Sequence, residues 1–188
     1  GNDRLGGAKI GYLDSGVFLN ITGKIGSHFR VRLSPSRTAL IPEDLIQFLP
    51  KGTFSPSSLT SSWRVHGDAD FDYVTVGLSS RLPYQSFQLI QPSKIVVDVF
   101  GAVNNTNWIT QLESVKEIKN VNYEQLEDEV FRITIDLVHS QHWGHFIYYN
   151  GNNLVIKVRR QPKELALKNL TIGVDAGHGG SNTGAMGP

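Results

Sequence analysis

The chain has 188 residues and a formal net charge of +1, from 18 Lys and Arg against 17 Asp and Glu, which excludes the strongly basic surface of a nucleic-acid-binding protein. Hydrophobic residues make up 39% of the chain, which suffices for the packed cores of one or two domains. No apolar run approaches the roughly 20 residues that a membrane helix needs, and the absence of cysteine excludes disulfides and thiolate metal sites.

Residues 1–52 contain five short runs of alternating apolar residues separated by turn-forming residues, which predict a small half-open barrel. In one of these runs Phe29, Val31 and Leu33 share a face, as the two-residue period of a strand requires. The order of the runs resembles the bacterial SH3-like domains that flank cell-wall hydrolases. Those domains frequently carry a peptide-contacting tryptophan in a late strand, whereas residues 39–41 hold no aromatic. A ligand-binding barrel and a packing module therefore both remain open here.

Residues 53–62 are rich in Ser, Thr, Gly and Pro and predict a linker. From 63 to 162, six or seven strands at close spacing predict a β-sandwich. The alternation is clearest in residues 72–78, 94–100 and 130–138, and Asn150-Gly151-Asn152 is a hairpin turn signal between residues 142–149 and 153–159. The runs at 94–101 and 130–137 resemble the AMIN domain. That resemblance implies a sandwich placed ahead of amidase catalytic domains in envelope proteins, which brings the enzyme to peptidoglycan, often at the division site.

An aromatic cluster lies in the strand predicted at 142–149. Because successive side chains of a strand point to opposite faces, Trp143 and Tyr149 fall on one side and Phe146 and Tyr148 on the other. One pair is expected in the core. Aromatic faces stack on sugar rings, so the other pair is a candidate wall-binding surface. Trp63 and Trp108 are further candidates for the same surface; the sequence does not place them.

Other clusters of polar residues have simpler explanations. The aspartates at 68, 70 and 72 are spaced like calcium ligands, but Tyr73 replaces the required glycine, which favours a solvated turn. His142 and His145 would point to opposite sides of a strand, which disfavours a shared metal ion. The acidic run at 124–129 is expected to be a solvated loop.

The last stretch, residues 171–188, predicts a short buried strand over Thr171–Asp175 followed by a glycine-rich turn that presents His178. Neutral imidazole is a good zinc ligand. The run Asp175-Ala176-Gly177-His178-Gly179-Gly180 resembles the opening of the zinc-dependent N-acetylmuramoyl-L-alanine amidases, with alanine where that family usually has proline. The resemblance implies that His178 is the first zinc ligand. We expect Asp175 to hold the site in place through contact with the ligand and not with the metal ion.

The amidase family supplies a glutamate and a histidine as further zinc ligands, and a glutamate as general base, at later positions. Residues 163–188 are therefore interpreted as a linker and the truncated start of an α/β catalytic domain, and the chain alone is predicted to be inactive. The parent enzyme would cleave the amide between the muramic-acid lactyl group and L-alanine.

Three hypotheses remain open for the chain. It is the targeting region of a zinc amidase, a non-catalytic module that binds peptidoglycan or a cell-division or envelope protein, or a regulatory region that packs on the catalytic domain. Each places it in the periplasm or cell envelope, after removal of a signal peptide that the sequence does not contain.

Overall fold

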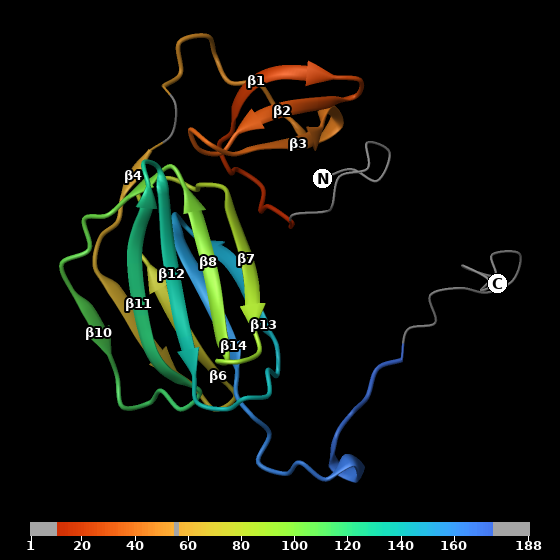
Figure 1. The fold of residues 1–188 in the computed structure, drawn as a ribbon, viewed down its shortest axis with the longest axis vertical. Coiled ribbons are helices and arrows are strands. Elements are labelled where there is room, and N and C mark those ends of the chain that lie inside the picture. The colour runs from red at the N-terminus through yellow and green to blue at the C-terminus, as the bar shows by residue number, and fades with distance from the viewer. Residues whose placement is uncertain (1–10, 55–56, 175–188) are drawn as a thin grey trace, which may run out of the picture.

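The computed structural model describes residues 11–54 and 57–174, and the part of the chain that it describes is mostly β with no α-helix (Figure 1). No helix among these residues is long and apolar enough to span a membrane. The strands and 3-10 turns are β1 (Asn20–Ile25), β2 (His28–Arg32), β3 (Thr38–Pro42), η2 (Glu43–Leu45), β4 (Ser58–Leu59), β5 (Trp63–Gly67), β6 (Phe71–Val76), β7 (Tyr84–Leu89), β8 (Lys94–Phe100), β9 (Ala102–Val103), β10 (Ile109–Gln111), β11 (Ile118–Glu127), β12 (Val130–Leu137), β13 (His145–Asn150), β14 (Asn153–Arg159) and η3 (Leu167–Asn169).

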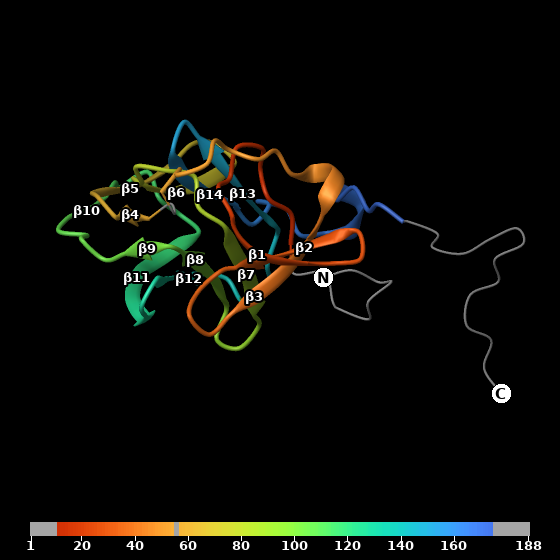
Figure 2. The ribbon, with the colours of Figure 1, turned by 90° about the horizontal axis from the view of Figure 1, so that it is seen from above.

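A β-sandwich forms the body of the molecule, as the alternating runs predict. One sheet has the strand order β10-β5-β6-β14-β13 and the other β11-β12-β8-β7, and Figure 2 shows the two layers from their ends. The predicted hairpin is present, because β13 and β14 pair from His145↔Val158 to Asn150↔Asn153 and Gly151 takes the positive φ of 60° that the turn requires.

The core lies between the two sheets and is built from the residues that the two-residue period assigned to it. Phe131, Ile133 and Ile135 of β12 are fully buried, and they face Val74 and Ile156 of the other sheet within one hydrophobic cluster. Sequence reasoning did not assign β5 to a strand, yet Trp63 of β5 is 2% exposed and its ring packs edge-on against Phe131 at 5.7 Å. Trp63 is thus a core residue and is excluded from the candidate binding surface.

A buried carboxylate ties one end of the sandwich together. Asp72, fully buried on β6, accepts hydrogen bonds from the backbone N–H groups of residues 116–118 at the start of β11. The Arg160 guanidinium donates two further bonds to its other oxygen, at 2.8 and 2.6 Å. Every acceptor position of Asp72 is therefore used, which offsets the cost of burying its charge. Its position also rules out a calcium loop at 68–72.

The N-terminal module, defined as residues 11–54, is an open sheet and not the predicted barrel. Its three strands pair in the order β1-β2-β3, so the described residues leave β1 and β3 as edges. The apolar side of the sheet is covered by the chain that follows η2, where Phe48 packs edge-on against Phe29 of β2 at 5.4 Å. Residues 46–53 lie in an irregular segment across the sheet, and no strand forms there to close it.

The N-terminal module docks on the end of the sandwich through charged and polar contacts (Figure 1). Arg37 donates to Asp98 of β8 at 3.2 Å, and Arg32 donates to Glu129 at 2.8 Å. Ser36 donates to both oxygens of Glu127, at 2.6 and 2.9 Å. The acidic run at 124–129 is therefore in part a docking surface, and its prediction as a simple solvated loop is wrong for the glutamates at 127 and 129.

The two predicted connecting segments differ in structure. Residues 57–62 contain β4, which pairs in parallel with β9 at Ser58↔Ala102, so this part of the linker is fixed to the sandwich. Residues 163–174 leave the sandwich with one 3-10 turn, η3, and no strand. The described part of the strand predicted over Thr171–Asp175 is irregular. Asp175, His178 and the glycine-rich turn lie outside the described residues.

Candidate functional site

The outer face of the five-stranded sheet carries a cluster of aromatic and cationic side chains. Strand register places them in cross-strand rows, whose members lie within side-chain contact of one another. The rows are His66, Tyr73, Lys157 and Phe146; Arg64, Thr75, Val155 and Tyr148; and Phe71 with Arg159. We call the set of Phe71, Tyr73, Phe146, Tyr148, Lys157 and Arg159 the aromatic–cationic face.

Strand β13 supplies the most exposed rings of this face. Phe146 is 60% exposed and Tyr148 37% exposed, whereas Tyr149 is buried in the core, where its hydroxyl donates to Leu82 O at 2.7 Å. Burial raises the pKa of Tyr149 far above its usual value, which keeps the hydroxyl neutral. Trp143 is half-buried before β13 begins, with an indole N–H that has no partner among the described residues. Phe146 and Tyr148 are thus the pair that faces solvent.

Two cations of β14 lie among these rings. The ammonium of Lys157 is 3.9 Å from the centre of the Phe71 ring and 5.6 Å from that of Tyr73. The Arg159 guanidinium lies 5.9 Å from the Phe71 ring. A cation over an aromatic face is attracted by the ring quadrupole, which fixes its position while it keeps its charge. Among the described residues, neither cation forms an ion pair with a carboxylate.

The β5–β6 turn orients the Tyr73 ring. The Tyr73 hydroxyl donates to Asp68 Oδ2 at 2.6 Å, while Asp68 Oδ1 accepts the backbone N–H groups of Asp70 and Phe71. This hydrogen bond from Tyr73, with the two backbone bonds, lowers the pKa of Asp68 to about 2. The same bond raises the pKa of Tyr73 to about 12. The His66 ring stacks on the Tyr73 ring, with centroids 5.0 Å apart and an interplanar angle of 13°.

The remaining predicted residues do not join this face. Trp108 is 67% exposed beside β10, where its indole donates to Thr110. His142 contacts Ser93 and Leu89 O, and His145 contacts Gln88. Within residues 11–54 and 57–174, no group of three His, Asp or Glu side chains is arranged to hold a metal ion. The zinc prediction rests on His178, whose position the structure does not describe.

The outer face of the opposite sheet differs, because two arginines there share one buried carboxylate. Asp98 is 1% exposed and receives two bonds from Arg132 of β12, at 2.7 and 2.9 Å, in addition to the bond from Arg37. The hydrogen bonds that Arg132 donates to Asp98 raise the pKa of Arg132. The N-terminal module covers one end of this face through Arg37 (Figure 1), whereas no ion pair involves the cations of the aromatic–cationic face among the described residues.

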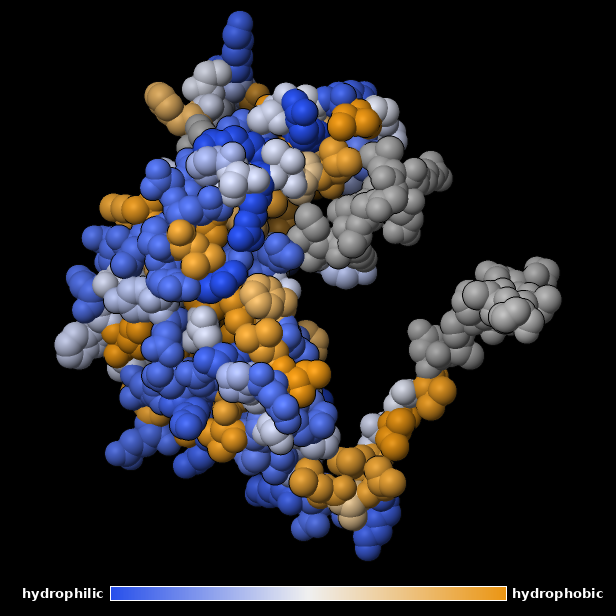
Figure 3. Space-filling view, in the orientation of Figure 1, coloured by the Kyte–Doolittle hydropathy of each residue, from blue (hydrophilic) through white to orange (hydrophobic). Residues whose placement is uncertain are grey.

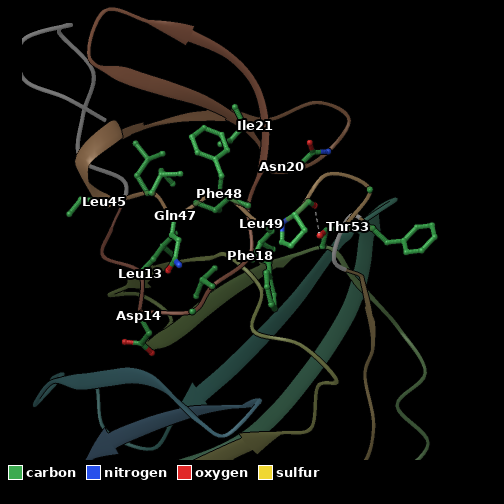
Figure 4. Close-up of a pocket in the computed structure, with 18 residues that line it drawn as sticks. Leu13, Asp14, Phe18, Asn20, Ile21, Leu45, Gln47, Phe48, Leu49 and Thr53 are labelled. Atoms are coloured by element: carbon green, nitrogen blue, oxygen red, sulfur yellow. Dashed lines mark hydrogen bonds between the residues drawn. The ribbon is translucent and has the colours of Figure 1, made fainter.

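The N-terminal module has an apolar groove of about 640 Å³ between β1 and the segment after η2 (Figure 4). Phe18, Ile21, Leu45 and Phe48 line it, and Phe48 is 67% exposed. Residues 39–41 hold no aromatic, and Phe18 and Phe48 supply the rings of this groove from other parts of the module. The alternation of β1 and β2 gave no signal for Phe48, because residues 46–53 follow neither a helical nor a strand period.

The comparison with known families decides the identity of the sandwich. The AMIN domain matches residues 62–158, which is the whole two-sheet body from β5 to β14. The chain belongs to the AMIN family. AMIN domains are non-catalytic modules of the periplasm or cell envelope, with an implied association with peptidoglycan. No SH3 domain and no amidase catalytic domain is detected in the chain, and no curated protein matches it.

The AMIN sandwich was predicted from strands 94–101 and 130–137, and these are β8 and β12, the two central strands of the four-stranded sheet. They pair from Val130↔Phe100 to Asp136↔Lys94 without a bulge. The sandwich therefore lies within the AMIN match, and the N-terminal module lies outside it.

Proposed function

We propose that this chain is the non-catalytic targeting region of a peptidoglycan amidase, and that its AMIN domain holds the enzyme on the glycan strands of the cell wall. The observation that carries the proposal is the pair of exposed rings on β13, Phe146 at 60% and Tyr148 at 37%, on an outer face of an AMIN sandwich. Exposed aromatic rings held by a rigid sheet offer sugars a preorganised stacking surface at little entropic cost.

Co-sedimentation with purified cell-wall sacculi tests this proposal. The chain should pellet with sacculi, and the double variant Phe146→Ala, Tyr148→Ala should lose roughly tenfold or more in affinity through the lost stacking. Phe54→Ala is the matched control, because Phe54 is 94% exposed in the N-terminal module and lies off the AMIN domain. Equal loss in both variants, or no pelleting of the unchanged chain, would count against targeting through this face.

The enzymatic part of the proposal concerns a longer protein that contains this chain. We propose that it is a zinc-dependent N-acetylmuramoyl-L-alanine amidase in which His178 is a zinc ligand and Asp175 supports it. Zinc bound there would polarise the amide carbonyl and lower the pKa of a bound water. The support is the run Asp175-Ala176-Gly177-His178-Gly179-Gly180 after an envelope module of the AMIN family.

The complete open reading frame tests the amidase proposal. It should encode a glutamate, a histidine and a second glutamate after Pro188, and the protein should release stem peptides from muropeptides in a zinc-dependent way. His178→Ala should abolish release and lower the zinc content, whereas His142→Ala, a histidine of the AMIN domain, should change neither. A reading frame without those three residues would refute the proposal.

A second candidate function is packing on a catalytic domain, and the segment 163–174 favours it. Leu167, Ile172 and Val174 are 74%, 66% and 90% exposed, and Figure 3 shows apolar residues along this segment away from the sandwich. Several exposed apolar side chains on one short segment indicate a surface that another domain covers. Higher activity of the longer protein without residues 1–162 would support a gating role, and unchanged wall binding by that truncated form would contradict targeting.

A further inference from the structure

The aromatic–cationic face presents charge that the protein itself does not neutralise. Lys157 and Arg159 stand next to each other on one side of β14, and the described residues place only rings against them, at 3.9 Å for Lys157 and 5.9 Å for Arg159 from the Phe71 centroid. On the opposite sheet, Arg132 and the Arg37 side chain of the N-terminal module both donate to the buried carboxylate of Asp98. Cations that are positioned by rings and not by carboxylates keep their full charge for an incoming anion.

One acid close to Lys157 is already occupied by other hydrogen bonds. Asp68 feels the charge of Lys157, but its carboxylate accepts the Tyr73 hydroxyl and two backbone N–H groups. Both cations therefore remain available beside the exposed ring of Phe146, which is the direct cross-strand neighbour of Lys157. Directly opposed side chains of neighbouring strands have Cβ atoms about 5 Å apart. The Lys157 ammonium lies over Phe71 on the other side of β14, and its flexible stem would let it turn to a short anionic substituent of a sugar stacked on Phe146.

We propose that the aromatic–cationic face binds a sugar that carries its own carboxylate, the free lactyl carboxylate of a muramic-acid residue from which the peptide has been removed. This inference rests on the proposed function. The lactyl group is joined to the sugar ring through one ether oxygen, so its carboxylate stays within reach of Lys157 when the ring stacks. The carboxylates of a stem peptide lie further out on a flexible chain, and ordering them would cost conformational entropy.

The proposed ligand is the product of the proposed reaction. Hydrolysis of the lactyl–alanine amide adds water across the C–N bond and leaves a carboxylate on the sugar and the amino group on the departing peptide. The AMIN domain would then be retained where its enzyme has already acted, and it would not compete with the catalytic domain for glycan that still carries peptides.

Calorimetric titration of the 188-residue chain with three matched tetrasaccharides of alternating N-acetylglucosamine and N-acetylmuramic acid tests this assignment. The first has free lactyl carboxylates, the second has them converted to carboxamides, and the third retains its stem peptides. The carboxylate form should bind roughly tenfold tighter than the carboxamide, as expected for a charge-assisted contact. The preference should weaken with added salt.

Single-residue variants test which side chains produce the preference for the carboxylate over the carboxamide form. Lys157→Met, which keeps an apolar stem over Phe71, and Arg159→Gln should each reduce the preference for carboxylate to within about threefold while leaving carboxamide binding unchanged. Phe146→Ala should weaken both forms by the same factor. Lys119→Met is the control, since Lys119 is an exposed lysine of β11 on the other sheet, and it should change neither. Thermal melts of each variant verify that the fold is intact.

The outcomes separate the two proposals. Equal affinity for carboxylate and carboxamide would overturn the anionic assignment and leave wall binding intact. Tighter binding of the peptide-bearing glycan would overturn it in favour of the stem peptide as ligand. Failure of all three glycans to bind would refute both the anionic assignment and glycan targeting by this face.

Discussion

The two outer faces of the sandwich are built from the same kinds of residue and use them differently. Each combines aromatic rings with arginine or lysine. On the β8–β12 face the carboxylate of Asp98 gathers Arg132 and Arg37 and is 1% exposed. On the β6–β14 face Lys157 and Arg159 meet rings only, and Phe146 remains 60% exposed. These charges are paired on the β8–β12 face, where the N-terminal module docks on the sandwich. Among the described residues they are unpaired on the β6–β14 face, which presents them to solvent.

This difference has a physical basis in desolvation. A carboxylate that leaves water must be compensated by hydrogen bonds from donors, best of opposite charge, and Asp98 obtains them from two arginines. A cation over a ring needs no such partner to remain in place. Charge pairing on the β8–β12 face therefore contributes to stability, whereas charge on the β6–β14 face should contribute little to stability and more to recognition.

The largest expected effect comes from breaking the paired face. Asp98→Ala leaves Arg132 and Arg37 without their shared carboxylate, and we expect the free energy of unfolding to fall by about 3 kcal/mol, less than for a fully buried pair because both arginines are partly exposed. Urea denaturation followed by tryptophan fluorescence measures it. Asp128→Ala, at an exposed position beyond β11, should stay within about 0.5 kcal/mol. Similar losses in both variants would show that Asp98 has no special structural role.

A smaller effect is expected from the contact that docks the N-terminal module. Glu127 accepts Ser36 at 2.6 Å and Ser34 at 3.1 Å, and Glu127→Ala removes both bonds. We expect a loss of about 1 kcal/mol in the free energy of unfolding. The amide of Phe18, which donates to Arg81 O across the same junction at 3.2 Å, should exchange its hydrogen faster. Glu124→Ala, at an exposed position of the same strand, is the control, and equal exchange in both variants would contradict docking through Glu127.

The sequence predicted the elements whose side chains alternate without interruption. β8 and β12 lie between neighbouring strands in the sheet centre, and in β12 strict alternation separates Phe131, Ile133 and Ile135 from the outer residues. β5 was not assigned, although Trp63 and Val65 alternate with polar residues there, because its five residues follow directly on the linker. The barrel was predicted from short alternating runs. Alternation shows which side chains share a face but not which strand edges pair, because edge pairing depends on contacts between residues far apart in sequence.

The candidate site could be predicted only in part from the alternation of side chains along the strands. Alternation separated Tyr149 from the pair Phe146 and Tyr148, and the structure places Tyr149 in the core. Nothing in the sequence indicated that Lys157 and Phe71 join that pair, because they come from different strands whose register only the folded sheet defines. The β-strand period could have marked Phe71, Tyr73 and Lys157 as outward residues, but not as neighbours.

The smallest effect should arise on the aromatic–cationic face, where the Tyr73 hydroxyl lowers the pKa of Asp68 from an ordinary 3.8 to about 2. A carboxylate with a depressed pKa in the folded state adds stability above the unfolded value, and that stability is lost as the pH falls through the folded value. Tyr73→Phe removes the largest cause of the shift and keeps the ring. The pKa of Asp68, read by NMR titration, should rise towards 3.8.

The stability of the same variant should follow the pH in a defined way. Tyr73→Phe should be slightly less stable than the unchanged chain near neutral pH, and the difference should disappear as the pH falls from 3.8 to about 2. A pH-independent difference would assign the effect to packing of the ring and not to the hydrogen bond. Because the ring stays in place, glycan binding should be unchanged, and a large loss of binding in Tyr73→Phe would show that the hydroxyl, and not the charge of Lys157 with the exposed rings, determines recognition on this face.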